Sequence, residues 1–371
     1  MAPSPQDAAR RVLEAAVAAG TFPAAAVDVG SSTGPEWQDA LGTLTVDPPV
    51  AATVDTIYDL ASLTKVLATT TVVMQLAADG HLQLGEDVRS FFEDWRGVDR
   101  ASVTVRDLLE HASGLPARLV DRPPSSRREF EHEIGSIALE YPPRTRSIYS
   151  DLGFMLLGFI AEQRGRATLP RQFADVLVRL KPDTTYLWSE SYVVSGFSRT
   201  KPLTFELDPD LRRGAAPTLA MDDDVRRGQI LVGEVHDSYA AALGGAAGHA
   251  GLFGTAPAVG AFARLLLGAA RGDERLPRPF APRWIREFTT KSTVPGSSRA
   301  LGWDTMLPTS SCGSRMSAAA FGHVGFTGTS LWIDPERDRY FVLLTNRACR
   351  GGTLDEMRTV RRAFHDALGG F

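Results

Sequence analysis

A serine and a lysine three residues apart, Ser62 and Lys65, have the types and spacing needed for acyl transfer. Residues three apart share a face of a helix, and an apolar helical pattern runs from here to Gly80. A serine hydroxyl becomes a good nucleophile when a neighbouring group removes its proton, and an amine can do this or assist a third group. The dipole of a helix that begins at Ser62 also stabilises negative charge there. The pair therefore predicts a site for acyl transfer through a serine ester.

The Ser-x-x-Lys spacing is short, and a second copy at Ser198 and Lys201 shows that it arises by chance. Pro202 follows that second copy at once, so we interpret it as part of a loop. Lys65 is one of four lysines among 40 basic residues. A chain that otherwise uses arginine thus has an amine here, where a deprotonable group is useful. By itself the pair is also compatible with an ordinary first helical turn that carries a surface lysine.

Two later stretches place polar residues at the ends of predicted elements. Tyr149 and Asp151 come directly before or at the start of an apolar helical run over 152–160. The phenol can therefore point into a cleft near positive groups that lower its pKa, and the alternative is a plain helix cap with a packing tyrosine. His323 and Gly325 lie in a predicted strand, where a glycine marks close approach of a ligand or of another backbone.

A competing nucleophile is Ser32, in the stretch G-S-S-T-G at 30–34, which matches the G-x-S-x-G nucleophile elbow. That elbow leads from a strand into a helix. Here β-type segments lie on both sides, over 24–29 and 37–44. We therefore interpret 30–34 as a hairpin turn, and an α/β-hydrolase esterase based on Ser32 stays open to experiment.

The remaining pattern predicts the elements that position these residues. Capping boxes begin helices at Thr104 and Thr353. The glycine-rich loop over 244–254 lacks a phosphate-binding lysine, so we interpret it as backbone pressed against another element. The stretch 176–205 is turn-rich and predicts an irregular excursion over the surface. Further helices are expected over 6–19, 259–267 and 354–368, and strands over 319–324, 329–333 and 340–345.

Composition is typical of a globular protein in water. The chain has 371 residues, is 43% apolar and carries a net charge of -4, so nucleic acid and anionic membranes are not expected partners. No stretch approaches the ~18 apolar residues of a membrane span. The first residues lack the features of an export signal, which predicts a cytoplasmic location, or a periplasmic or extracellular one if the start is truncated. Cys312 and Cys349 predict two free thiols rather than a disulfide, and the scattered histidines predict no metal.

Taken in order, the three motifs resemble those of the penicillin-recognising serine hydrolases, in the branch of class C β-lactamases, DD-peptidases and related esterases. That family carries S-x-x-K, Y-x-N and K-T-G or H-x-G in this order and with similar separations. Here the motifs are S-L-T-K at 62–65, Y-S-D at 149–151 and H-V-G at 323–325. Flanking stretches match too: Y-D-L-A at 58–61, H-A-S-G-L-P at 111–116 and G-F-T-G-T-S-L-W-I-D-P at 325–335. The resemblance covers nearly the whole chain except about 176–230.

The resemblance implies an α/β fold with two subdomains and a cleft between them that holds the active site. Residues 1–60 and 295–371 would form an antiparallel sheet flanked by helices, and 61–294 a mostly helical subdomain that includes the excursion over 176–205. It also implies roles for single residues. Ser62 is the nucleophile, and Lys65 and Tyr149 share the general acid and base work, with Tyr149 favoured as base. The N–H groups of Ser62 and Phe326 form the oxyanion hole.

Asp151, His323 and Gly325 are the expected substrate-binding residues, and two of them depart from the family pattern. His323 replaces the usual lysine and is mostly neutral at pH 7, so a permanent positive charge for a substrate carboxylate is expected to be missing. Asp151 replaces asparagine and adds a negative charge. Both changes favour an esterase or peptidase on ester, amide or D-alanyl peptide-like substrates over an efficient β-lactamase. A class C-like β-lactamase and a catalytically inactive ligand-binding protein are the alternatives, and no cofactor is expected.

Overall fold

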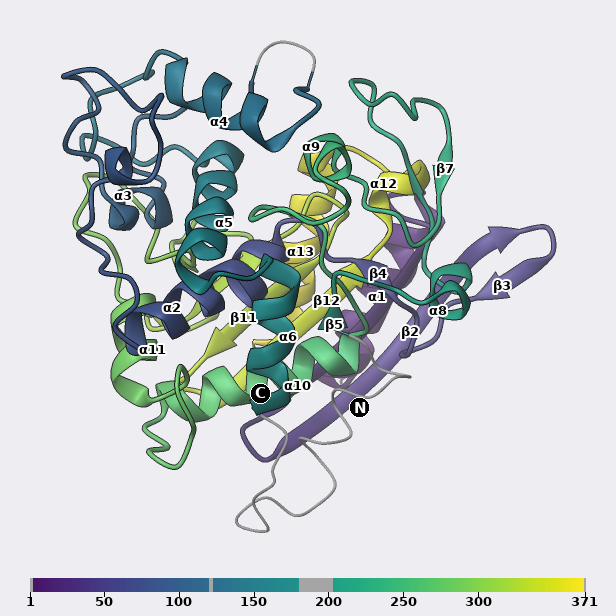
Figure 1. Cartoon of the computed structure of the whole chain (residues 1–371). Helices are drawn as coiled ribbons and strands as arrows, with labels where there is room; N and C mark the ends of the chain where they lie inside the picture. The colour runs from purple at the N-terminus through teal and green to yellow at the C-terminus, as the bar shows by residue number, and fades with distance from the viewer. Residues whose placement is uncertain (1–2, 120–122, 180–202, 370–371) are drawn as a thin grey trace.

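The computed structural model describes residues 3–119, 123–179 and 203–369, and its centre is an antiparallel sheet made from both ends of the chain (Figure 1). The seven strands lie in the order β3-β2-β1-β12-β11-β10-β9. Their bounds are Ala24–Ser31 (β1), Gly34–Val46 (β2), Pro49–Ala51 (β3), Asp304–Thr305 (β9), Phe321–Val324 (β10), Ser330–Asp334 (β11) and Arg339–Thr345 (β12). The N-terminal β1 pairs directly with the C-terminal β12. The predicted α/β fold with this sheet is confirmed.

The turn between β1 and β2 is a hairpin, as expected for the stretch 30–34. Ser31 pairs with Gly34 across the turn, and strand continues on both sides. Ser32 donates its hydroxyl to Asp338 Oδ2 (2.9 Å) at the neighbouring turn between β11 and β12. Because a nucleophile elbow requires a helix after the serine, the alternative based on Ser32 is wrong.

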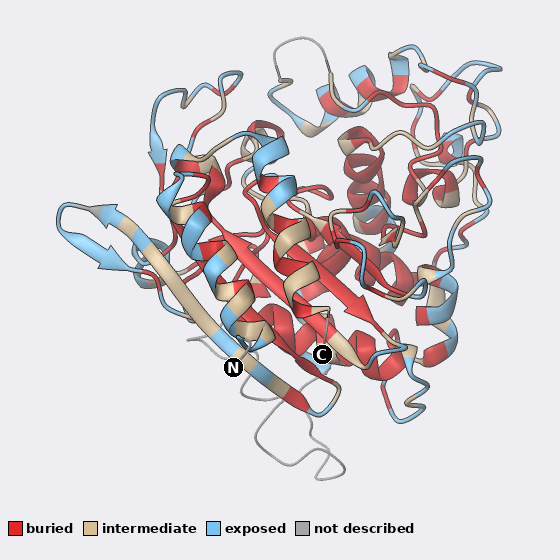
Figure 2. Ribbon diagram, turned by 180° about the vertical axis from the view of Figure 1, so that it is seen from behind, coloured by how far each residue is buried: buried red, intermediate tan, exposed pale blue. Residues whose placement is uncertain are grey.

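Both faces of the sheet are covered by helices, so its central strands are buried throughout (Figure 2). Side chains alternate between the two faces. On β1, Val27 packs with Phe364 in the core under α1 (Pro5–Ala18) and α13 (Leu354–Leu368). Its neighbour Ala26 packs with Phe262 of α10 (Ala256–Ala270) on the opposite face. The sheet is therefore packed between two helical layers, and β10 lies next to its edge strand β9.

A mostly helical region lies beside the sheet (Figure 1). Its apolar centre contains α2 (Thr70–Ala78) and α5 (Asp151–Gly165), most of whose residues are buried. The sequence predicts one helical run from Ser62 to Gly80, but its first part, Lys65–Thr69, is a π-helix (η1) that continues into α2. The other helices are Val88–Ser90 (η2), Val105–Leu109 (α3), Arg127–Ser136 (α4), Leu169–Arg179 (α6), Pro209–Arg213 (α8), Ser238–Ala242 (α9), Pro282–Thr289 (α11) and Arg347–Arg350 (α12). Short strands are Tyr58–Asp59 (β4), Leu203–Thr204 (β5), Thr218–Leu219 (β6), Ile230–Leu231 (β7) and Phe253–Gly254 (β8).

Several local predictions can be compared with these elements. The capping boxes at Thr104 and Thr353 are both formed. Cys312 and Cys349 are free, buried thiols, as predicted. Most of the expected excursion over 176–205 lies outside the described residues, which resume at Leu203. The division into two subdomains stays a prediction. It placed α10 in the helical subdomain, whereas in the structure α10 packs on the sheet. Within the described ranges, no helix combines the length and apolar character needed to cross a membrane.

Candidate active site

Ser62 lies at the end of a tight turn that β4 leads into. Ala61 has a positive φ of 48°, and its N–H donates to Asp59 Oδ1 (2.8 Å). The other oxygen of that carboxylate accepts the N–H of His236 (2.7 Å). Burial raises the pKa of Asp59 to about 6, while these two N–H donors oppose the rise. The carboxylate thus fixes the turn that presents the Ser62 hydroxyl.

Lys65 is fully buried one helical turn after the serine. Its ammonium donates three hydrogen bonds: to Ser62 Oγ (3.0 Å), to Asp151 Oδ1 (2.7 Å) and to the carbonyl of His249 (3.1 Å). All three of its donors are therefore satisfied. Burial by itself lowers the pKa of Lys65, but Asp151 and Tyr149 outweigh it and the net pKa is raised. The amine is consequently an ammonium at neutral pH, a donor to Ser62 rather than a proton acceptor.

Tyr149 is the second group on the serine, and its phenol donates to Ser62 Oγ (2.7 Å). Burial raises the pKa of Tyr149, and the opposing effect of Lys65 does not reverse this. The expectation that nearby positive groups bring this pKa below its ordinary value is therefore wrong, because desolvation of the phenolate dominates. The ring is held by His111, whose centroid lies 4.8 Å away and whose Nδ1 accepts the N–H of Ser150 (3.0 Å).

The third motif lies across the cavity on β10. Gly325 must lack a side chain, because a Cβ there would meet Thr329 Oγ1 at 2.1 Å and the carbonyl of Leu60 at 2.7 Å. The predicted close approach of another backbone is confirmed, since Leu60 belongs to the turn before Ser62. Among the described residues, neither the N–H of Ser62 nor that of Phe326 donates to a protein acceptor. Two residues that line the same cavity, Ser62 and Phe326, thus have free backbone donors.

His323 is 2% exposed and electrically neutral. Its Nδ1 donates to the carbonyl of Val324 (2.8 Å), which leaves Nε2 as an acceptor. Burial lowers the pKa of His323 well below its usual value, and the positive charges of Arg299 and Lys65 lower it further. The expected neutral histidine is confirmed.

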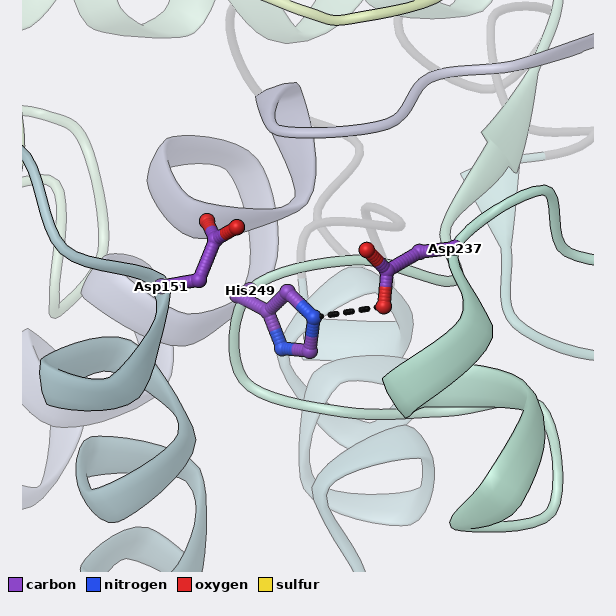
Figure 3. Close-up of side chains that lie close together, drawn as sticks. All are labelled: Asp151, Asp237 and His249. Carbon is purple, nitrogen blue, oxygen red and sulfur yellow. Dashed lines mark hydrogen bonds and ion pairs between the residues drawn. The ribbon is translucent and has the colours of Figure 1, made fainter. Parts of the chain in front are cut away.

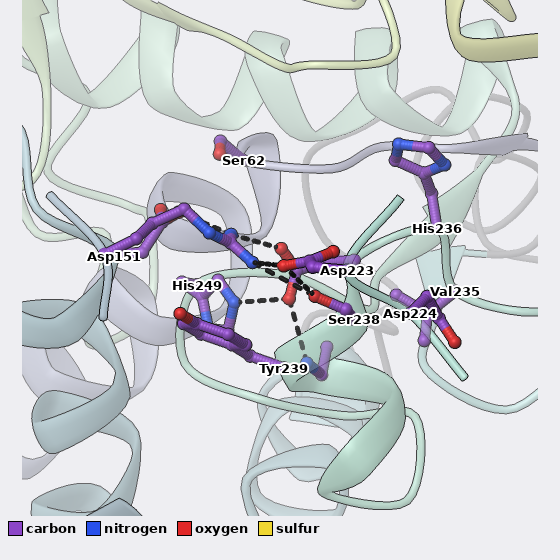
Figure 4. Close-up of polar contacts among 12 residues, drawn as sticks. Ser62, Asp151, Asp223, Asp224, Val235, His236, Ser238, Tyr239 and His249 are labelled. Carbon is purple, nitrogen blue, oxygen red and sulfur yellow. Dashed lines mark hydrogen bonds and ion pairs between the residues drawn. The ribbon is translucent and has the colours of Figure 1, made fainter. Parts of the chain in front are cut away.

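Asp151 joins Lys65 to a network of charged groups. Figures 3 and 4 show two members of this network, Asp151 and His249. Its Oδ1 accepts from Lys65, and its Oδ2 accepts from Arg118 Nη1 (3.1 Å). Arg118 also donates to Asp237 Oδ2 (2.8 Å), whose other oxygen lies 2.7 Å from His249 Nε2. Burial opposes ionisation of both carboxyls, but the neighbouring cations prevail and the pKa values of Asp151 and Asp237 are lowered. Arg118 contacts both carboxylates, so each is held ionised next to a permanent cation.

A cavity of about 330 Å³ joins these groups. Of the residues predicted from the sequence it is lined by Ser62, Tyr149, Asp151, His323, Gly325 and Phe326. Lys65 is buried beneath the cavity wall, where its ammonium contacts the hydroxyl of Ser62. The three motifs, which are 87 residues or more apart in the chain, thus meet at one place.

Comparison with known proteins agrees with this arrangement. A family model described as "Beta-lactamase" matches residues 9–365. The chain belongs to the β-lactamase family. It is 31% identical over 332 residues to a "Putative D-alanyl-D-alanine carboxypeptidase" of Escherichia coli (strain K12), covering 82% of this chain and 72% of that protein. A protein of the same description from Salmonella agona (strain SL483) is 30% identical over 325 residues, with 81% and 71% covered.

Two solved structures share the fold of this β-lactamase-family chain. One is "EstCE1, a hydrolase with promiscuous acyltransferase activity", with a TM-score of 0.71 and 18% identity. The other is a class C β-lactamase from Rhodobacter sphaeroides, with a TM-score of 0.72 and 17% identity. Each comparison covers 97% of this chain and 98% of the other chain. Together with the family match, they identify a serine hydrolase with the β-lactamase fold.

Arg118, Asp237 and His249 were not predicted from the sequence. The glycine-rich loop gave a partial signal, because it was expected to press against another element. This is confirmed: a Cβ on Gly248 would meet the carbonyl of Phe154 on α5 at 2.0 Å. The close approach brings the carbonyl of His249 to Lys65. No local pattern indicated that the histidine side chain would also meet an aspartate.

Asp151, Asp237 and His249 are close enough to hold a metal ion, since their ligand atoms lie within 4.8 Å of one another (Figure 3). The carboxylate oxygens are, however, already bonded to Lys65 and Arg118. An ion would have to displace both cations, so this donor set fits an ion-pair network better than a metal. The absence of a metal from the mechanism stays a prediction.

Proposed function

We propose that this protein hydrolyses esters or amides through an acyl-enzyme on Ser62. The observation that carries the proposal is the pair of hydrogen bonds to Ser62 Oγ, from Tyr149 at 2.7 Å and from Lys65 at 3.0 Å. A surface serine usually bonds to water, whereas the hydroxyl of Ser62 accepts from a buried ammonium and a buried phenol. The free N–H groups of Ser62 and Phe326 complete the arrangement, because they can donate to the oxygen of a substrate carbonyl.

In the reactive form Tyr149 is a phenolate, stabilised by the ammonium of Lys65, which lies 4.9 Å from its ring centroid. Ser62 Oγ attacks the carbonyl carbon as its proton passes to Tyr149, and the carbonyl oxygen becomes an anion held by the two N–H groups. Tyr149 then protonates the leaving oxygen or nitrogen as its bond to carbon breaks. Water attacks the ester with Tyr149 again as base, and Ser62 regains its proton. Because the pKa of Tyr149 is raised, the acylation rate should increase with pH through the neutral range.

For the substrate we favour a peptide or ester with a free carboxylate near the scissile bond, as in a D-alanyl peptide. His323 is neutral, but Arg299 lines the cavity with its guanidinium 5.3 Å from the ring of Tyr149. Among the described residues Arg299 pairs with no carboxylate, so a permanent positive charge is available. The expectation that the cleft lacks such a charge is therefore wrong. Relatives described as D-alanyl-D-alanine carboxypeptidases support the peptidase choice.

Intact-mass measurement after reaction with a fluorophosphonate, followed by peptide mapping, tests the nucleophile. We expect one adduct on Ser62 that is lost in Ser62→Ala and kept in the matched control Ser32→Ala. A parallel incubation with penicillin measures the β-lactamase alternative, since rapid turnover of the drug would favour it over a peptidase. An adduct that persists in Ser62→Ala contradicts the proposal. A parent protein that forms no adduct would favour a ligand-binding protein without catalysis.

A further inference from the structure

Arg361 on α13 is a buried arginine, 5% exposed, whose partners are all backbone carbonyls. Its Nη2 donates to the carbonyls of Gly325 (2.7 Å) and Thr329 (2.9 Å), and its Nε to that of Gly328 (3.3 Å). No carboxylate among the described residues forms an ion pair with it. Burial and the neighbouring Arg347 lower the pKa of Arg361 to about 9. Burying a guanidinium without a counter-ion is costly, so its position calls for a functional reason.

The carbonyl of Gly325 and the N–H of Phe326 belong to the same peptide unit. In a trans peptide these two groups point in opposite directions within one plane. Arg361 holds the carbonyl end, and so fixes the direction of the N–H at the other end. That N–H is one of the two free backbone donors described above, and Gly325 and Phe326 line the same cavity as Ser62.

We propose that Arg361 is a positioning residue of the oxyanion hole, acting through the peptide unit between Gly325 and Phe326. A charge-assisted hydrogen bond to the carbonyl polarises the amide and makes its N–H a stronger donor. The same bond prevents the peptide from rotating when negative charge develops on the substrate oxygen. Preorganised donors of this kind need no rearrangement during the reaction. The inference rests on the proposed function, since it gives the second donor of that site its orientation.

A second arginine supports the next peptide unit of the same loop. Arg347 donates from Nε and Nη2 to the carbonyl of Phe326 (3.0 and 2.5 Å). Its guanidinium also lies 4.6 Å from the centroid of the Phe326 ring, and His236 stacks on that ring at 5.4 Å. The loop is thus fixed on both sides of Phe326. The carbonyl of Gly325 also accepts the N–H of Gly328 (3.1 Å). Among the described side chains, however, only that of Arg361 donates to the peptide unit that carries the free N–H.

The test compares Arg361→Met, Arg361→Lys and the control Arg362→Met. Arg362 is the next residue of α13 and also donates to two carbonyls, those of Pro308 (3.1 Å) and Ser310 (2.6 Å), but it does not line the cavity. The substrates are p-nitrophenyl acetate and its thionoester, whose C=S group is a poorer hydrogen-bond acceptor. We expect Arg361→Met to lower kcat on the oxoester by about 10-fold to 100-fold, less than the loss of a whole oxyanion donor, with little change in KM. The thionoester rate should fall much less.

A merely structural role of Arg361 would lower both rates equally, so an unchanged ratio of oxoester to thionoester rates overturns the inference. So would an equal effect of Arg362→Met on that ratio. Arg361→Lys keeps the charge but loses the planar set of donors. Its ratio of oxoester to thionoester rates should lie between those of the parent and Arg361→Met. If Arg361→Met does not fold, the ratio in Arg361→Lys decides alone. A parent protein that acylates no faster than Ser62→Ala would instead overturn the proposed function, so the two failures are distinguishable.

Discussion

The two walls of the cleft differ in whether their cations are paired with carboxylates. The helix-side wall is defined by Lys65, Arg118, Asp151, Asp237 and His249. In it, the cations Lys65 and Arg118 are both paired with carboxylates. The sheet-side wall, defined by Arg299, His323, Gly325, Phe326 and Arg361, contains a neutral histidine and two arginines. Neither arginine has a carboxylate partner in the part of the chain that the structure describes.

This difference separates two tasks of the site. A paired network fixes the ammonium of Lys65 against the serine and keeps it charged. Unpaired cations leave a positive potential on the other side, where the substrate's carbonyl oxygen and any carboxylate would lie. In the proposed acylation, negative charge would therefore develop next to donors that no carboxylate of the described residues neutralises. The comparison can be tested by disturbing one wall at a time.

The largest effect is expected from Lys65→Met on the helix-side wall. This change removes a donor to Ser62 and the cation that stabilises the phenolate of Tyr149. The acylation rate should fall by about 10²-fold to 10⁴-fold, the usual range for a group in acid–base catalysis. Because Lys65 lowers the pKa of Tyr149, its loss raises that pKa, and the increase of rate with pH should move to higher pH. Fluorophosphonate labelling rates measured against pH would check both. Lys291→Met, at an exposed lysine, is the control, and an unchanged profile in Lys65→Met would show that the ammonium is not involved.

Asp237→Asn should mainly affect stability, because it leaves Arg118 and His249 without their shared partner. Breaking a buried ion pair costs about 3 kcal/mol of the free energy of unfolding. The pKa of Asp237 is held well below its usual value, so this stabilisation is present above about pH 4 and is lost as the pH falls. Urea unfolding at pH 7 should therefore show a large difference in the free energy of unfolding between Asp237→Asn and the parent. The same measurement in acid should show a smaller difference.

The control for that change is Asp210→Asn, at an ion pair with Arg213 in which the aspartate is 87% exposed. Exposed pairs contribute little, so the control should unfold like the parent. Equal stability of Asp237→Asn and the parent at pH 7 would mean that the helix-side wall is not held by its pairing.

Of the sheet-side wall the sequence predicted His323, Gly325 and Phe326 but not the two arginines, and it predicted the proposed nucleophile Ser62. It predicted nothing of the network formed by Arg118, Asp237 and His249. Ser62, Tyr149 and Gly325 stand at element boundaries, where local patterns such as caps and strand glycines are informative. Arg118 and Asp237 lie in loops 119 residues apart, and nothing local links them. In a chain rich in arginine, one more arginine gives no signal. The network could be found only after folding brought α5, α9 and the glycine-rich loop together.

Two errors in the prediction have physical causes that the sequence does not contain. The pKa of Tyr149 depends on the balance between burial and the charge of Lys65, and burial is a property of the packed site. The π-helical turn at Lys65–Thr69 was expected to be α-helical. Apolar periodicity does not distinguish these helices over a single turn, and π-helical turns are frequent at functional sites.

The smallest effect is expected from Arg299→Gln on the sheet-side wall. A hydrogen bond to a charged group contributes about 1.5–3 kcal/mol, so kcat/KM should fall by about 10-fold or more for a peptide that ends in a free carboxylate. Hydrolysis of p-nitrophenyl acetate, which has no negative charge, should change little. Arg283→Gln is a matched control, because its guanidinium also lies 5.3 Å from an aromatic ring, that of Trp284, but outside the cavity. Added salt should weaken the preference of the parent for the charged peptide and leave the variant unaffected. Equal losses on both substrates would assign Arg299 to the support of Tyr149 instead, and the positive potential of this wall would then serve the oxyanion alone.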